Sequence, residues 1–120
     1  MEFLSAYKTN PPTSGPHWVD VAGGGIKKEP VPDELVLHSM EHGAAVVWYK
    51  EGLDQRDIDK VTEAFNNSSG KKIMLARKDL DVPVALTSWG YLLKLQTIDE
   101  TKIKEFIETN NDRAPEKAPI

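Results

Sequence analysis

The stretch "AAVVWYKEGLDQRDIDKVTEAFNNSSGKKIMLARK", residues 44–78, decides the fold class. It opens with a continuous apolar run (44–50), rich in β-branched and aromatic residues, that predicts a buried strand. An amphipathic helix follows, with Asp54 as N-cap and Gly70 beyond its end. Its apolar face is made of Ile58, Val61, Ala64 and Phe65. Residues 71–78 predict a second strand, and a helix that joins two strands is typical of a right-handed crossover between parallel strands.

The elements after this stretch complete an α+β domain. "VPVALTSWGYLLKL", residues 82–95, predicts one long strand, or two strands with a break at Gly90. The four-residue link Lys78–Asp81 suits a β-hairpin with the preceding strand. Asp99 caps a last helix, residues 100–111, whose core-facing residues are Ile103, Phe106 and Ile107. We therefore predict a small two-layer sandwich, in which two helices cover one face of a mixed β-sheet and a long Pro/Gly-rich loop precedes it.

Length and composition limit the remaining possibilities. The 120 residues are enough for a single domain, which we divide into a Pro/Gly-rich loop packed on the core (7–32), an αβ core (33–112) and a tail (113–120). The net charge of −4, with no run of Lys and Arg longer than two, argues against a nucleic-acid partner. The chain has no cysteine, which excludes disulfides, thiol catalysis and thiolate-bound metals. No window approaches the roughly 18 apolar residues of a membrane-spanning helix.

The three histidines of the chain lie in its two least ordinary segments. His17 ends the turn-rich stretch "NPPTSGPH", residues 10–17, within a region of five prolines and four glycines between Thr9 and Pro32. His38 and His42 lie in "LHSMEHG", just before the first strand. Proline fixes φ, so the early stretch is preshaped, and presenting His17 costs less entropy than presenting it from a flexible arm.

The conformation of residues 33–43 has two readings. As a helix, with Gly43 as its stop, the segment places His38 and His42 one turn apart on one side, with Glu41 beside them. That spacing is used to hold zinc on helices. As an extended segment, it places both histidines and Met40 on one face, where a thioether between two imidazoles favours copper.

Both readings predict a transition-metal site. Two ligands are too few for a tight site, and His17 is the only imidazole left to supply a third. We predict that His17, His38 and His42 bind the ion, with Met40 or Glu41 as a fourth contact. Copper is favoured and zinc is the alternative, because imidazole binds both and copper has the higher affinity. Carriage or sensing of the metal is the simplest role, and another protein is a further possible partner.

Two alternatives remain open. In the first, the domain is a non-catalytic structural or interaction module, and the histidines tie the Pro/Gly-rich loop to the core without metal. In the second, "HSMEH" (38–42) matches the HxxEH pattern of inverted zinc proteases, so Glu41 serves as base in a metal-assisted hydrolysis. A non-catalytic role is favoured, because the motif runs into a glycine and a buried strand within two residues.

Four stretches together suggest a family. "NPPTSGPHW", "VPDELVLHSMEHGAAVVWY", "PVALTSWG" and "FIETNNDRAPE" resemble, in that order, the bacterial and archaeal family called domain of unknown function 3105, from about Tyr7 to Glu116. The resemblance implies that many relatives are exported, or tethered to a membrane through an N-terminal hydrophobic segment. The chain shows no such segment, so we expect either that one upstream of Met1 was cut away or that this member is soluble and internal, and the first is favoured. We therefore expect an extracytoplasmic setting. The positions it marks are Pro12, Ser14, Gly15, Pro16, His17, His38, Glu41, His42, Gly43, Thr87, Trp89, Gly90, Pro115 and Glu116.

Overall fold

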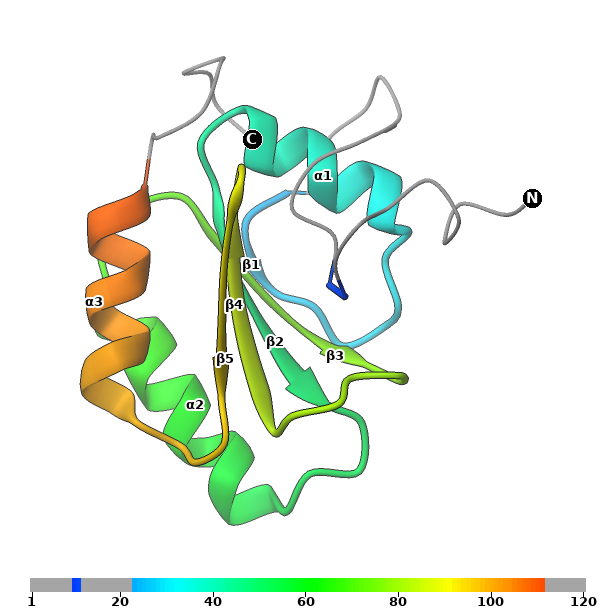
Figure 1. The fold of residues 1–120 in the computed structure, drawn as a ribbon, viewed down its shortest axis with the longest axis vertical. Coiled ribbons are helices and arrows are strands. Elements are labelled where there is room, and N and C mark those ends of the chain that lie inside the picture. Colours follow the sequence, from blue (N-terminus) through cyan, green and yellow to red (C-terminus); the bar gives the residue numbers. More distant parts are fainter. Residues whose placement is uncertain (1–9, 12–22, 112–120) are drawn as a thin grey trace.

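The computed structural model describes residues 10–11 and 23–111, and the predicted tail and most of the predicted loop lie outside this part. The described elements form a small α+β domain, as predicted (Figure 1). In chain order they are β1 (Gly25–Ile26), α1 (Asp33–Glu41), β2 (Ala45–Lys50), α2 (Gln55–Asn66), β3 (Lys72–Arg77), β4 (Val84–Ser88), β5 (Tyr91–Leu95) and α3 (Glu100–Asn110).

The strands form one mixed sheet in the order β1-β3-β2-β4-β5. β2 and β3 are parallel neighbours joined by α2, which is the crossover that the sequence predicts. β2 also pairs antiparallel with β4, and β4 pairs antiparallel with β5. The predicted break at Gly90 is confirmed: its φ of 81° places it in the left-handed region that glycine adopts without strain, and the chain reverses there between β4 and β5.

The predicted hairpin across Lys78–Asp81 is wrong. β3 and β4 do not pair, because β2 lies between them. All five residues of β4 are buried, so this strand needs a neighbour on each side, and it finds them in β2 and β5. The link that carries the chain past the end of β2 is itself anchored, since Leu80 and Val82 are buried in the core.

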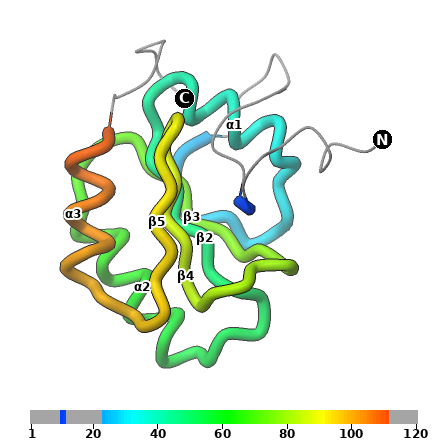
Figure 2. Tube along the Cα trace, viewed as in Figure 1, coloured from blue at the N-terminus to red at the C-terminus, as the bar shows by residue number. Residues whose placement is uncertain are grey.

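Helices cover both faces of the sheet. α2 and α3 lie side by side on one face, as predicted, and enclose a core with Val47, Met74 and Leu86 (Figure 2). α1 lies against the opposite face, where it encloses a second core with Trp48 and Ile73. α1 therefore adds a third layer that the two-layer prediction did not include.

Packing holds α1 in place. A helix of nine residues is too short to be stable in isolation. Val36, Leu37 and Met40 are at most 1% exposed, and burial of such side chains contributes about 1.5–3 kcal/mol each. The helix ends at Glu41, with His42 as its C-cap. Gly43 follows the C-cap with a φ of 103°, which glycine adopts readily, and its N–H donates to the Met40 carbonyl. Within the described residues, no helix is long and apolar enough to cross a bilayer.

Candidate functional site

The helical reading of residues 33–43 is confirmed, and the extended reading is wrong. The imidazole rings of His38 and His42 meet edge to face, with centroids 4.6 Å apart and an interplanar angle of 81°. A helix has 3.6 residues per turn, which places positions i and i+4 on one side. α1 therefore presents the two imidazoles as neighbours, on the side away from the sheet.

Glu41 joins this pair from the same turn of helix. Its carboxylate Oε1 lies 3.9 Å from His38 Nε2, and the two side chains are only 20% and 15% exposed. Both histidines and Glu41 take part in contacts within the fold. A carboxylate at this distance can orient an imidazole or accept its N–H after a small side-chain rotation.

The structure does not bring Met40 to the histidine pair. Its side chain is fully buried against the sheet, on the opposite side of α1. There the hydroxyl of Thr87 donates to Met40 Sδ at 3.6 Å, while Thr87 Oγ1 accepts a hydrogen bond from Trp48 Nε1 at 2.8 Å. The predicted role of Met40 as a ligand depended on the extended reading, because only that geometry places residue 40 on the same face as residues 38 and 42.

The C-terminal end of α1 is held by Lys71, the residue just before β3. Lys71 Nζ donates to the His42 carbonyl at 3.0 Å, which satisfies an acceptor at the helix end with a cation. Sequence reasoning missed this contact. Lys71 belongs to a local Lys-Lys pair, and nothing in the order of residues indicates that it reaches back 29 positions.

The N-terminal end of α1 is held by a second cation, Arg77 of β3. Its Nη1 donates to Asp33 Oδ1 at 2.9 Å, and its Nε donates to the side chain of Asn10. The guanidinium lies over the Trp48 ring, 5.1 Å from the centroid, and Asn10 Nδ2 donates to the Asp79 carbonyl at 3.0 Å. These contacts fix the first residue of the "NPPTSGPH" stretch next to the start of α1.

The third predicted ligand, His17, lies outside the described residues, as do Pro12, Ser14, Gly15 and Pro16. Within residues 10–11 and 23–111, no three His, Asp or Glu side chains gather closely enough to hold a metal ion. The part of the candidate site that the structure describes is therefore His38, His42 and Glu41 on α1.

The described residues therefore form a small α+β domain, in which a mixed five-stranded sheet lies between α1 on one face and α2 and α3 on the other. The histidine pair lies on α1. The chain belongs to the family described as "Protein of unknown function (DUF3105)", whose model matches residues 4–119. No curated protein and no solved structure matches the chain.

Proposed function

We propose that the protein binds a transition-metal ion through His17, His38 and His42 and serves as a metal carrier or sensor in an extracytoplasmic setting. The single observation that supports this proposal is the His38–His42 pair, two imidazoles one helical turn apart with ring centroids 4.6 Å apart. Neutral imidazoles are common ligands for zinc and copper, and two of them on adjacent turns can chelate one ion.

Glu41, the acidic neighbour of the histidine pair, also supports a metal site. Glu41 Oε1, 3.9 Å from His38 Nε2, suits a carboxylate that orients a ligating histidine or becomes a ligand itself. The donor set of nitrogen and oxygen favours Cu(II), with Zn(II) as the alternative. Because Met40 lies in the core, its thioether adds no preference for Cu(I).

Chain length allows His17 to supply the third ligand. Asn10 is held next to Asp33 through Arg77, and His38 lies five residues further along α1, about 7.5 Å along the helix axis. Seven residues from Asn10 to His17 span at most about 23–25 Å. The tether is therefore long enough for the His17 ring to reach the pair on α1.

The test is titration of Cu(II), Cu(I) and Zn(II) into chelator-stripped protein, read by calorimetry and by melting temperature. We expect micromolar or tighter binding of Cu(II), weaker binding of Zn(II) and a higher melting temperature with metal. His17→Gln, His38→Gln and His42→Gln should each weaken binding at least tenfold, while Lys60→Ala, on the exposed side of α2, should leave it unchanged. Absence of binding by the unaltered protein contradicts the proposal.

The glutamine variants also separate the two alternatives. An amide can replace an imidazole in hydrogen bonding but is a poor metal ligand, so variants that unfold at the wild-type temperature yet lose metal indicate ligation. If the histidines only tie segments together, metal has no effect on any variant. If the HxxEH segment is hydrolytic, metal-loaded protein should cleave members of a panel of esters, amides and phosphoesters, and Glu41→Gln should abolish that cleavage while metal stays bound.

A further inference from the structure

β5 forms one edge of the sheet, and its outer side has no partner strand among the described residues. Tyr91 and Leu93 are 48% and 37% exposed, and only one other large apolar residue in the described chain, Ile26, is comparably exposed. An open strand edge with exposed apolar side chains readily pairs with another strand. This edge is therefore the strongest candidate for an interaction surface.

The register of the hairpin fixes which backbone groups are free. Ser88 and Tyr91 close the two-residue turn at Gly90, and the pair that closes such a turn is hydrogen-bonded. Bonded and non-bonded pairs alternate along an antiparallel ladder, so Tyr91, Leu93 and Leu95 bond to β4. Leu92 and Lys94 consequently direct their N–H and C=O groups outward.

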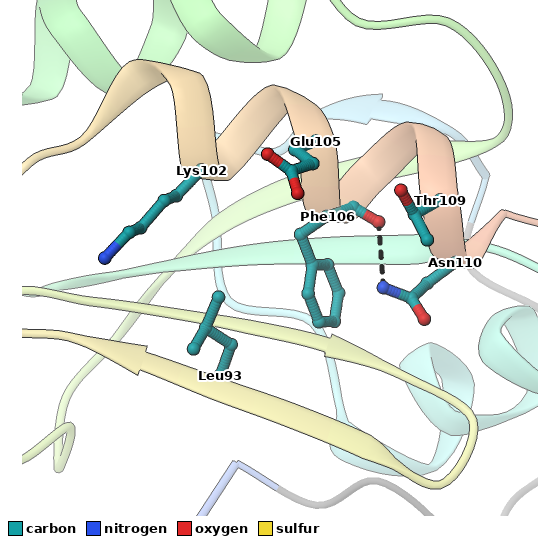
Figure 3. Close-up of a pocket in the computed structure, with 6 residues that line it drawn as sticks. All are labelled: Leu93, Lys102, Glu105, Phe106, Thr109 and Asn110. Atoms are coloured by element: carbon teal, nitrogen blue, oxygen red, sulfur yellow. Dashed lines mark hydrogen bonds between the residues drawn. The ribbon is translucent and has the colours of Figure 1, made fainter.

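A groove of about 300 Å³ lies between this edge and α3. It is lined by Leu93, Lys102, Glu105, Phe106, Thr109 and Asn110 (Figure 3). The figure shows Leu93 across from the stretch of α3 between Lys102 and Phe106. The floor is apolar, and the rim carries one cation and one anion, both exposed.

We propose that β5 pairs antiparallel with β5 of a second copy of this chain, about a two-fold axis at Leu93. In that register Leu92 of each copy lies opposite Lys94 of the other, so the outward-facing backbone groups meet as hydrogen-bonded pairs. Leu93 lies next to its own counterpart in a non-bonded pair, where side chains approach most closely. Tyr91 of each copy covers Leu95 of the other.

Charge complementarity identifies the occupant as a second copy. A two-fold axis at Leu93 turns the second α3 end for end beside the first. Because Leu93 lies across from the stretch that begins at Lys102, this rotation brings Lys102 of each copy near Glu105 of the other. An isologous contact of this kind forms two identical ion pairs at once.

Lys94 does not prevent another strand from pairing with β5. A lysine on an edge strand is a common device against unwanted pairing. Here, however, Lys94 Nζ donates to Asp81 Oδ2 at 2.9 Å within the same copy, so the ammonium is directed to the β3–β4 link. Within residues 10–11 and 23–111, the outward backbone groups of β5 therefore remain available for pairing.

The test is sedimentation equilibrium on the full chain up to about 1 mM. The proposed contact consists of one pair of short strands and two ion pairs, and small contacts give micromolar or weaker association. We expect a reversible monomer–dimer equilibrium, with amide exchange at Leu92 and Lys94 slowed at high concentration. Leu93→Lys should give a monomer at every concentration. Lys102→Glu places like charges in both pairs and should raise the dissociation constant about tenfold.

A charge exchange tests the register. Glu105→Lys should weaken the dimer as Lys102→Glu does, and the double variant Lys102→Glu/Glu105→Lys should restore it. Lys60→Glu on α2 makes the same change in net charge as Lys102→Glu and should leave the dimer intact. All three positions are exposed, so folding should be preserved. A wild-type monomer at the highest concentration overturns the proposal, and so does a dimer that is unaffected by Leu93→Lys or not restored by the double variant.

Discussion

Arg77 and Asp33 are joined by a hydrogen bond of 2.9 Å between Nη1 and Oδ1, with the two side chains only 12% and 22% exposed. The pair links the end of β3 to the first turn of α1, and a second guanidinium nitrogen of Arg77, Nε, donates to the Asn10 side chain. One side chain therefore contacts both the first residue of α1 and Asn10. This arrangement leads to the first prediction.

Replacement of Arg77 by methionine should destabilise the domain and release Asn10. The long apolar stem can still cover Trp48, so the loss is that of the charged hydrogen bonds, and the free energy of unfolding should fall by about 1–3 kcal/mol. Urea unfolding measures this change, and faster amide exchange in a peptide that includes Asn10 reports the release. Arg56→Met, on the exposed side of α2, is the matched control. Equal stability of the two variants would contradict the prediction.

Met40 should behave as a core residue and not as a ligand. Met40→Leu conserves volume and should cost less than about 1.5 kcal/mol, whereas Met40→Ala leaves a cavity and should cost about 2–5 kcal/mol. Chemical denaturation gives both values. Copper affinity should be unchanged in the leucine variant, since the Met40 side chain is fully buried on the side of α1 away from the histidines. A large loss of Cu(I) binding in a stable leucine variant would show that the thioether ligates after all.

Acid should weaken the contact between the β3–β4 link and β5. The hydrogen bond from Lys94 lowers the pKa of Asp81 below its ordinary value of 3.8, and the charges of Lys94 and Lys50 act in the same direction. A carboxylate with a lowered folded-state pKa stabilises the fold above the unfolded pKa. That contribution is lost as the pH falls from about 3.8 through the folded value. The stability difference between wild type and Asp81→Asn should be small, because Asp81 is 61% exposed, and it should shrink to nothing in this acid range. A difference that grows with acidity would be inconsistent with this sign.

Ser88 should be dispensable for stability. Ser88 is only 1% exposed, and its Oγ has no hydrogen-bond partner in the described structure. A buried hydroxyl without a partner keeps its desolvation cost, so Ser88→Ala should leave stability unchanged or raise it by about 1 kcal/mol. Thr87→Val, one residue away, is the contrasting variant. It removes the acceptor of the Trp48 N–H and should lower the free energy of unfolding by about 1–3 kcal/mol. Thermal unfolding of both variants measures these changes.

The crossover β2-α2-β3 was predictable because its elements carry distinct local patterns of apolar residues. β2 is a continuous apolar run, and the apolar face of α2 repeats at helical spacing. The position of β4 was not predictable from the same signals. A link of a few residues suits a hairpin equally well, and only the burial of β4 on both sides assigns it to β2.

The candidate site was predictable in part. The i, i+4 spacing of His38 and His42 indicates a shared face once the segment is helical, but a nine-residue segment with weak propensities left its conformation open. Lys71 and Arg77 could not be identified in advance. They hold the two ends of α1 through contacts across 29 and 44 positions, and no local pattern specifies such distances.

The sheet order also constrains the sequence of events during synthesis. Among the described strands, β1 pairs only with β3, through Gly25↔Ile73 and Ile26↔Met74, so β1 has no partner among them until some fifty further residues have been synthesised. β2 likewise has no strand to pair with until β3 has been synthesised. A nascent chain that stops within α2 should therefore remain open to proteases from β1 through β2, and protection of all three strands should arise together once β3 has emerged.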